Sequence, residues 1–337
     1  MVDSGWPIYK GQNVFPAGPS GDPMGYWDPE RSIVDSLRLY AYRHLFDFSK
    51  LYAVRQISQL LTACPVPQDT AFQNTVHMVQ LAEDFPLNLY FMSRIPQWFA
   101  VKVLRTSIIE DLTTTWFKRG LLLLPIPAQR GHEDIAALRN AGARVITRDK
   151  DLANAHRHVE RLIQESLKKS LAQLFAENNP VVADADLTGA SSAAEVTAVH
   201  EQGNEVVSNE MFFRIRLPNP ALRKYVTYML GRMLDEDEDV TLDVDALGKL
   251  EVPANLEAVA AAIDQMQSTD PASAFQDAQM DLDRVVAGLF GMAEEDLNYI
   301  TSTMTNDGFL KQLKPSLEHR GLRIQPYADH SQEDRYA

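Results

Sequence analysis

A chain of 337 residues with 45% apolar and 23% charged residues is long enough for one large or two to three smaller domains, and this composition excludes a wholly disordered protein. Its net charge of -14, taken alone, argues against nucleic acid as a partner, because phosphate contact needs Lys and Arg. The single cysteine, Cys64, excludes an intrachain disulfide, and neither a signal sequence nor an apolar run of roughly 18 residues is found, so a cytoplasmic protein without a membrane partner is expected.

The charge is distributed unevenly along the chain. Residues 1–150 carry 16 basic and 14 acidic side chains, whereas residues 151–337 carry 16 basic and 32 acidic ones. The contrast is strongest between 101–150, with nine basic and five acidic residues, and 201–300, with seven basic and twenty acidic residues. The two parts are therefore expected to face different partners or different solvent.

The first third of the chain predicts short strands and one helix. Residues 5–30 are rich in Gly and Pro and predict a strand followed by an ordered loop. The aromatic residues available to pin this loop are Trp6, Tyr9, Phe15, Tyr26 and Trp27. From Ser32 the apolar spacing fits a short helix and then strands, and residues 75–82 alternate as a strand does. Residues 86–106 predict a helix that is opened by its first proline and ended or kinked by its second.

The later part of the chain predicts mainly helices. Residues 134–179 predict two helices, of which the second is long, amphipathic and begins after Asp149. Its apolar stripe comprises Leu152, Val159, Leu162, Ile163, Leu167, Leu171 and Leu174. Residues 180–208 are small and polar and predict a linker or surface loop. A strand ended by "LPNP" follows, then a helix, and further helical patterns lie at 255–267 and 281–303.

These elements predict an α+β fold. The expected order is a mixed small-sheet domain at 1–130, a helical spacer at 131–179, a loop or linker at 180–208 and an acidic, mainly helical region at 209–337. Leu121–Leu124 would form a buried strand that closes the first domain, because Pro125 and Pro127 deny it further ladder hydrogen bonds.

No catalytic motif stands out, and we expect a chain that is not an enzyme by itself. The sequence has no Gly-rich phosphate loop, no dinucleotide fingerprint and no nucleophile elbow. His156 and His158 would point about 200° apart on a helix, which favours solvated helix surface over a shared metal. The acidic run at 235–245 lacks the Gly and Glu of a calcium loop, so a solvated turn is favoured over a metal site.

Basic residues interleaved with aromatic ones in the first 130 positions form the candidate DNA-binding set. Its members are Arg38, Arg43, Arg55, Lys102, Arg105, Lys118 and Arg119. Arg can bond guanine edges in the major groove, and Lys or Arg can hold phosphates. The alternative is that these side chains are only the solvated face of amphipathic elements.

Several segments, taken in order, resemble parts of the target-recognition domain of type IIG and BREX-like adenine-N6 DNA methyltransferases. They are "WPIYKGQNVFPAG", "YAYRHLFDFSKLYAVRQISQLLTACPVP", "LLLLPIP", "FRIRLPNPALRKYVTYMLGRM" and "MDLDRVVAGLFGMAEEDLNYITSTM". The segment "MSRIPQWF" departs from the Asn-Ser pattern of that family. Each motif is weak singly, and their common order carries the resemblance.

The resemblance implies a DNA specificity subunit, or a portion of one, with double-stranded DNA and a catalytic methyltransferase subunit or domain as partners. The family's cofactor loop and its Asn-Pro-Pro-Tyr-type tetrapeptide are not in this sequence, so S-adenosylmethionine is expected in the catalytic partner and no cofactor in this chain. The acidic region over 201–300 would either dock that partner or be a plain helical domain. The alternative function is an acidic, DNA-mimicking inhibitor that binds a partner protein.

Overall fold

A computed structural model provides the structure of the chain. It describes residues 5–27, 48–58, 60–73, 75–104, 114–115, 121–127, 131–189, 196, 198–208, 213–236 and 242–306. Helices and several small sheets occur together, so the predicted α+β class is confirmed. The chain divides into two compact units, the first formed by Met1–Asp151 with Ala272–Ala337 and the second by Leu152–Pro271.

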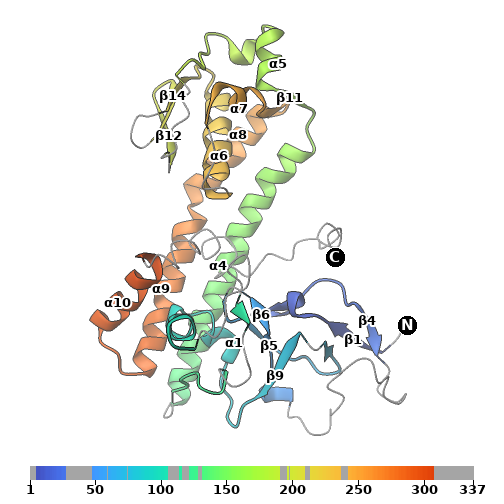
Figure 1. Ribbon diagram of the computed structural model, residues 1–337, viewed down its shortest axis with the longest axis vertical. Helices are drawn as coiled ribbons and strands as arrows, with labels where there is room; N and C mark the ends of the chain where they lie inside the picture. Colours follow the sequence, from blue (N-terminus) through green and yellow to red (C-terminus); the bar gives the residue numbers. More distant parts are fainter. Residues whose placement is uncertain are drawn as a thin grey trace. The chain divides into compact units, whose positions relative to one another are not determined.

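Short strands dominate the N-terminal part of the first unit (Figure 1). These strands are β1 Trp6–Tyr9, β2 Val14–Phe15, β3 Gly18–Pro19, β4 Gly25–Trp27, β5 Leu51–Arg55, β6 Ile57–Ser58, β7 Ala63–Pro65, β8 Ala71–Phe72, β9 Val76–Gln80 and β10 Thr114–Thr115. They form three-stranded sheets in the orders β4-β1-β8 and β7-β5-β9, and two-stranded pairs β2-β3 and β10-β6. β1 and β8 run parallel, and the other pairs described in this unit are antiparallel.

The predicted strands at the start of the chain and at 75–82 are confirmed by β1 and β9. The small sheets share a core of buried side chains, namely Val14, Leu51, Ala53, Cys64, Val66, Phe72 and Val76. Trp6 meets Trp27 edge to face with ring centroids 5.5 Å apart, so these two aromatics pin the opening loop as predicted. Tyr26 is 40% exposed and takes no part in the core.

The helices of the first unit come from both ends of the chain. They are α1 Leu87–Tyr90, α2 Arg94–Phe99, the π-helical turn η4 Ala100–Leu104, the first part of α4 His132–Gln164, α9 Pro271–Leu289 and α10 Glu294–Asn306. Pro86 immediately precedes α1, as predicted. Pro96 is the third residue of α2 and does not end it, because the first turn of a helix needs no amide from that position.

A buried carboxylate fastens α9 to the turn between α1 and α2. Asp283 is fully buried and accepts hydrogen bonds from Ser93 Oγ and the Arg94 backbone amide, both at 2.8 Å, and from Arg94 Nε at 2.5 Å. Gln279 Nε2 donates to the Met92 carbonyl at 2.8 Å. Residues 272–306 therefore belong to the first unit, whereas the composition of the sequence groups them with the acidic region at 209–337.

α4 runs through Asp149, after which the second of the two helices expected within 134–179 was to begin, and the other helix in this range is the short α5 Leu171–Ala176. The core-facing positions of α4 continue without a break at Ile135, Leu138, Ala141, Val145, Asp149, Leu152, Val159 and Ile163. Asp149 is 1% exposed and occupies a position on this stripe, so the predicted boundary after Asp149 lies inside the helix. Leu167 lies beyond the end of α4 and is 86% exposed, which removes it from the predicted stripe.

The expectation of a buried strand at Leu121–Leu124 is wrong. The segment forms a turn in which the Leu124 amide donates to the Leu121 carbonyl at 3.3 Å. Leu122 and Leu123 are 77% and 67% exposed, and only Leu124 of the four is buried. Tyr90 Oη donates to the Pro125 carbonyl at 2.5 Å, so the bond that orders this segment comes from a side chain and not from a strand ladder.

The second unit combines short strands with helices. Its elements after α4 are β11 Lys168–Ser170, α5 Leu171–Ala176, η6 Pro180–Val182, β12 Val199–Gln202, β13 Glu205–Ser208, β14 Arg214–Arg216, α6 Pro220–Glu236, α7 Val244–Gly248, β15 Glu251–Pro253 and α8 Leu256–Thr269. β12-β13-β14 form an antiparallel sheet and β11 pairs with β15. The predicted strand before "LPNP" and the helix after it are confirmed by β14 and α6.

The structure differs from the linker expected at 180–208. β12 and β13 form a hairpin there, and Gly203 at its turn has a φ of +60°, which glycine adopts without strain. Val206 and Val207 are both buried, and Val206 belongs to the hydrophobic core of the unit. The side chains of β12 alternate between half-buried and exposed, which accounts for the polar residues of that strand.

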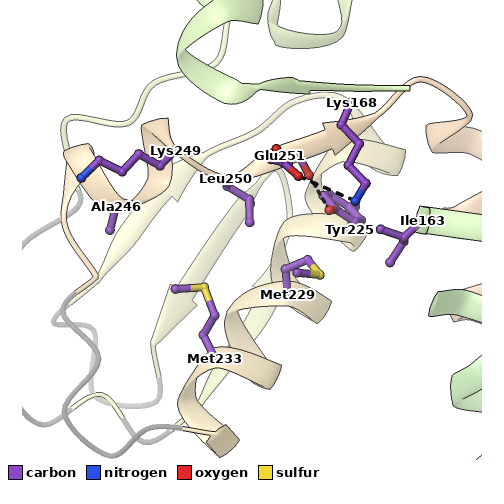
Figure 2. A pocket seen from close by; sticks show the side chains of 9 residues that line it. All are labelled: Ile163, Lys168, Tyr225, Met229, Met233, Ala246, Lys249, Leu250 and Glu251. Atoms are coloured by element: carbon purple, nitrogen blue, oxygen red, sulfur yellow. Dashed lines mark hydrogen bonds and ion pairs between the residues drawn. The ribbon is translucent and has the colours of Figure 1, made fainter. Parts of the chain in front are cut away.

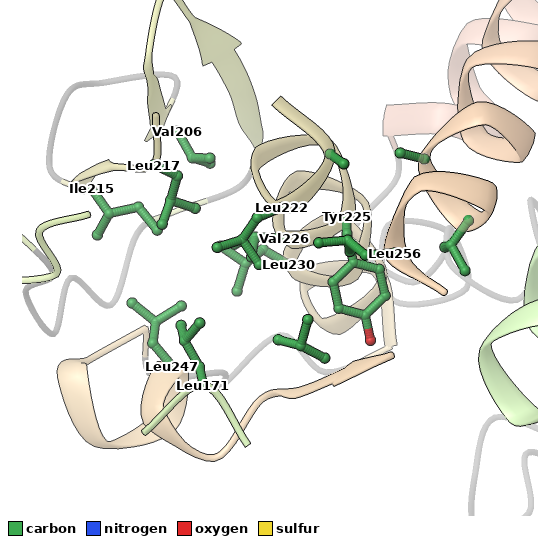
Figure 3. Close-up of a cluster of buried hydrophobic side chains, with 14 of the residues drawn as sticks. Leu171, Val206, Ile215, Leu217, Leu222, Tyr225, Val226, Leu230, Leu247 and Leu256 are labelled. Atoms are coloured by element: carbon green, nitrogen blue, oxygen red, sulfur yellow. The ribbon is translucent and has the colours of Figure 1, made fainter. Parts of the chain in front are cut away.

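The core of the second unit lies between the hairpin sheet and its helices. Leu222, Val226 and Leu230 project from one face of α6, and Val206, Ile215 and Leu217 approach from the strands (Figure 3). Leu171 and Leu247 close the cluster from α5 and α7 (Figure 3). This core contains only residues of the second unit, so the unit has the means to fold by itself.

No helix within the described ranges is both long enough and apolar enough to span a membrane.

Candidate nucleic-acid interface

Arg55 lies at the end of the central strand of the β7-β5-β9 sheet. Its backbone is opposite Val76 in β9, and its amide donates to the Thr62 carbonyl at 2.9 Å. The side chain is half-buried, and its Cγ lies 3.5 Å from the position that a Cβ on Gly11 would occupy. Gly11 is itself held by a 2.9 Å hydrogen bond from its amide to Thr75 Oγ1. The aliphatic part of Arg55 therefore lies beside Gly11.

The pairing of β6 with β10 joins two of the predicted basic segments. β6 begins two residues after Arg55, and β10 lies within the 101–120 stretch of the sequence. Thr114 is opposite Ser58 and Thr115 is opposite Ile57. Lys118 and Arg119 follow β10 in the chain by three and four residues.

Lys102 is exposed on η4 and follows the buried Val101. The helix before it is fastened to the chain between β6 and β7 through the buried amide of Gln97. Gln97 Oε1 accepts from the Leu61 amide at 2.9 Å, and Gln97 Nε2 donates to the Leu61 and Phe91 carbonyls at 2.7 and 2.5 Å. The elements that carry Arg55 and Lys102 are thus bonded to the same short connection.

The remaining members of the predicted set lie outside the described residues. They are Arg38, Arg43, Arg105, Lys118 and Arg119. Gln97 was not among the predicted residues, because an amide that bonds a distant backbone has no local sequence pattern. The pairing of β6 with β10 likewise has no local sequence pattern, because each strand is only two residues long.

His158, Asp243 and Cys64 are polar or reactive residues whose contacts and burial indicate structural roles. No group of three or more potential metal ligands occurs among the described residues. His158 is exposed, and its Nδ1 lies 3.3 Å from Arg161 Nη2. Both features fit a residue on a solvated helix surface. Asp243 caps α7 by accepting from the Ala246 amide at 2.7 Å, and Asp237–Thr241 of the acidic run lie outside the described residues. Burial raises the pKa of the Cys64 thiol to about 12, which keeps it protonated and poorly nucleophilic at neutral pH.

A pocket of about 470 Å³ in the second unit is mainly apolar (Figure 2). Its lining residues are Ile163, Lys168, Tyr225, Met229, Met233, Ala246, Lys249, Leu250 and Glu251. Tyr225 Oη donates to the Glu251 carbonyl at 2.6 Å, and Lys168 Nζ lies 3.7 Å from Glu251 Oε2. Burial raises the pKa of Tyr225 to about 12, so its hydroxyl is protonated at neutral pH and serves as a hydrogen-bond donor. These lining side chains suit apolar contact better than acid–base chemistry.

Comparison of the chain with family models, with curated proteins and with solved structures finds no match. The order of the sequence motifs and the geometry of the first unit are the grounds on which a function is proposed.

Proposed function

We propose that this chain is the DNA-recognition part of an adenine-N6 DNA methyltransferase or of a related phage-defence complex. On this proposal it positions a catalytic partner subunit or domain, which supplies S-adenosylmethionine binding and the methyl transfer. The pairing of β6 with β10 is the observation that favours this function, because it joins the segment after Arg55 to the basic 101–120 stretch. Two basic segments that are distant in sequence thereby share one small-sheet framework.

Recognition would combine phosphate contacts with readings of base edges. Arg and Lys side chains of the first unit hold the backbone, and an Arg can form a bidentate pair with guanine that discriminates against other bases by about 1–3 kcal/mol. The half-buried stem of Arg55 favours such specificity, because a side chain that is already partly confined loses less freedom on binding. The catalytic partner would then turn an adenine out of the base stack, since its target atom is inaccessible within the duplex.

Selection from a pool of random DNA duplexes tests the proposal. The full chain should retain a shared short sequence at fixed salt, both alone and with a methyltransferase partner. Arg55→Ala, Lys102→Ala and Lys118→Ala should each weaken binding to the selected duplex by roughly five- to 150-fold if they remove a contact of about 1–3 kcal/mol. Lys169→Ala is the matched control, because Lys169 is exposed in the second unit and pairs with Glu177 at 2.6 Å.

The outcomes separate the alternatives. Equal retention of all sequences, or an unchanged dissociation constant for the three variants with native unfolding curves, would refute the recognition role. Binding to a methyltransferase or restriction enzyme in competition with DNA, with no binding to DNA itself, would instead support an acidic DNA mimic.

A further inference from the structure

The second unit carries a polar depression on α4 that has no place in the recognition site described above. It measures about 450 Å³, and its lining residues, here called the α4 patch, are Asn154, Arg157, His158, Glu160, Arg161 and Gln164. Arg157 and Arg161 are exposed and one helical turn apart, so their side chains lie on the same face of α4. Val159 and Ile163, on the opposite face, are buried in the core and fix the orientation of the helix.

The α4 patch is positively charged although its unit is acidic. Residues 152–271 contain 10 basic and 20 acidic side chains. The patch itself contains a single carboxylate, Glu160, and this one is paired with Arg232 Nη1 at 2.9 Å. Because salt screens exposed charges beyond about 8–10 Å, the local sign of the patch decides which ligand it attracts at close range. An anion is therefore favoured.

Hydrogen bonds within the patch orient its guanidinium groups. Arg157 Nη2 donates to Asn154 Oδ1 at 2.6 Å, and Arg161 Nη2 contacts His158 Nδ1 at 3.3 Å. Arg161 forms no ion pair with a carboxylate among the described residues. A guanidinium has five N–H donors, so one donor can hold its orientation while others contact a phosphate. Asn154 and Gln164 add side-chain amides of the kind that contact DNA phosphates.

We propose that the α4 patch binds backbone phosphates of duplex DNA and does so without reading the base sequence. This inference rests on the proposed function, which supplies the duplex as ligand, and it assigns a DNA contact to the second unit as well. The patch would add affinity and salt dependence, whereas the first unit would add sequence selectivity. A helix surface with arginines one turn apart suits this role, because phosphate contacts position a protein on DNA and carry no direct sequence information.

The salt dependence of binding gives a sharp test. The double variant Arg157→Gln/Arg161→Gln is compared with the unaltered full chain on the selected duplex and on a scrambled duplex of equal length. If each arginine neutralises one phosphate, the slope of log K against log salt becomes less steep by about 1.8. Between 50 and 200 mM salt the affinity of the unaltered chain would then fall about tenfold more than that of the variant. The ratio of affinities for the two duplexes should stay constant.

A matched control removes the same number of charges from the same unit. Lys168→Gln/Lys169→Gln alters two cations whose partners are Glu251 and Glu177, and it should leave the slope unchanged. Unaltered unfolding curves for both double variants show that any difference is not a loss of folding. A slope that does not change in the arginine variant, or that changes equally in the lysine variant, overturns the role of the α4 patch.

The two proposals fail in distinguishable ways. Binding that ignores sequence but loses salt dependence in the arginine variant overturns the recognition function and supports the patch. Selective binding with an unchanged slope overturns the patch alone. A chain that retains no duplex at any salt concentration overturns both.

Discussion

Gly142 lies where α4 packs against α1 and leaves no room for a side chain. A Cβ built at this position would lie 2.8 Å from Leu89 Cβ and 3.0 Å from both of its Cδ atoms. Contacts this short force a shift of packed atoms, which typically costs about 1–3 kcal/mol, whereas the better helix propensity of alanine returns at most about 1 kcal/mol. Gly142→Ala should therefore lower the free energy of unfolding by about 1–2 kcal/mol in urea titrations.

Gly288→Ala provides the comparison, because Gly288 lies in α9 of the same unit and an added Cβ there meets nothing within 4 Å. This variant should be unchanged or slightly more stable than the unaltered chain. Equal effects of the two substitutions would show that helix propensity, and not close packing against Leu89, decides the outcome.

At the scale of elements, the attachment of α9 depends on one buried carboxylate. Asp283 is the shared acceptor for Ser93 and Arg94, whose side chain is 18% exposed. Removing one partner of such a pair leaves the other charge without compensation, which costs about 3–5 kcal/mol in buried pairs. Asp283→Asn should lower the free energy of unfolding by about 3 kcal/mol. This value is the lower limit of that range, because the asparagine side chain keeps one acceptor oxygen.

Asp281→Asn is the control on the same helix. Asp281 pairs with Arg144 at 3.1 Å, but the two side chains are 43% and 58% exposed. Exposed pairs contribute about 0–1 kcal/mol, so this substitution should have little effect. A similar loss in both variants would mean that the charge of α9, and not the buried network, stabilises its packing.

Local patterns account for the elements that the sequence predicts well. β9 alternates, and α6 follows a proline after a strand, so neighbouring residues determine both. The single α4 helix was missed because Asp149 was interpreted as a boundary, although its spacing continues the buried stripe. The β12–β13 hairpin could have been found from the two-residue turn Gly203–Asn204, because Gly-Asn is a common hairpin loop.

Non-local contacts account for what the sequence does not reveal. β6 and β10 are two residues each and far apart in the chain, so no periodicity indicates that they pair. The exposure of Leu122 and Leu123 is equally hidden, since four successive leucines predict burial by composition alone. The candidate interface was predicted as a set of basic residues, and only the structure relates Arg55 to the 101–120 stretch through β6 and β10.

At the scale of the whole molecule, the second unit is an insertion in the chain of the first. The chain leaves the first unit within α4 after Asp151 and returns to it at Ala272, at the start of α9. The first unit thus contains α9 and α10 from beyond the insertion, with Asp283 bonded to Ser93 and the centroid of the Phe290 ring 6.4 Å from that of Tyr90. The second unit has a complete core of its own.

This topology predicts different behaviour for two fragments. Leu152–Pro271 should unfold cooperatively when produced alone, because the cluster around Leu222, Val226 and Leu230 lies entirely within it. Met1–Asp151 should lack cooperative unfolding, since Ser93 and Arg94 lose Asp283 and Tyr90 loses Phe290. Thermal unfolding followed by circular dichroism, with amide NMR spectra of each fragment, distinguishes the two.

Adding a peptide of residues 272–306 in trans is the decisive control, because it restores the contacts of α9 and α10 without the covalent link. Cooperative unfolding of Met1–Asp151 should return with the unaltered peptide and not with a peptide that carries Asp283→Asn. If Met1–Asp151 instead gave a native-like transition alone, α9 and α10 would be accessories to the first unit, and the C-terminal segment would be available to pack against a partner.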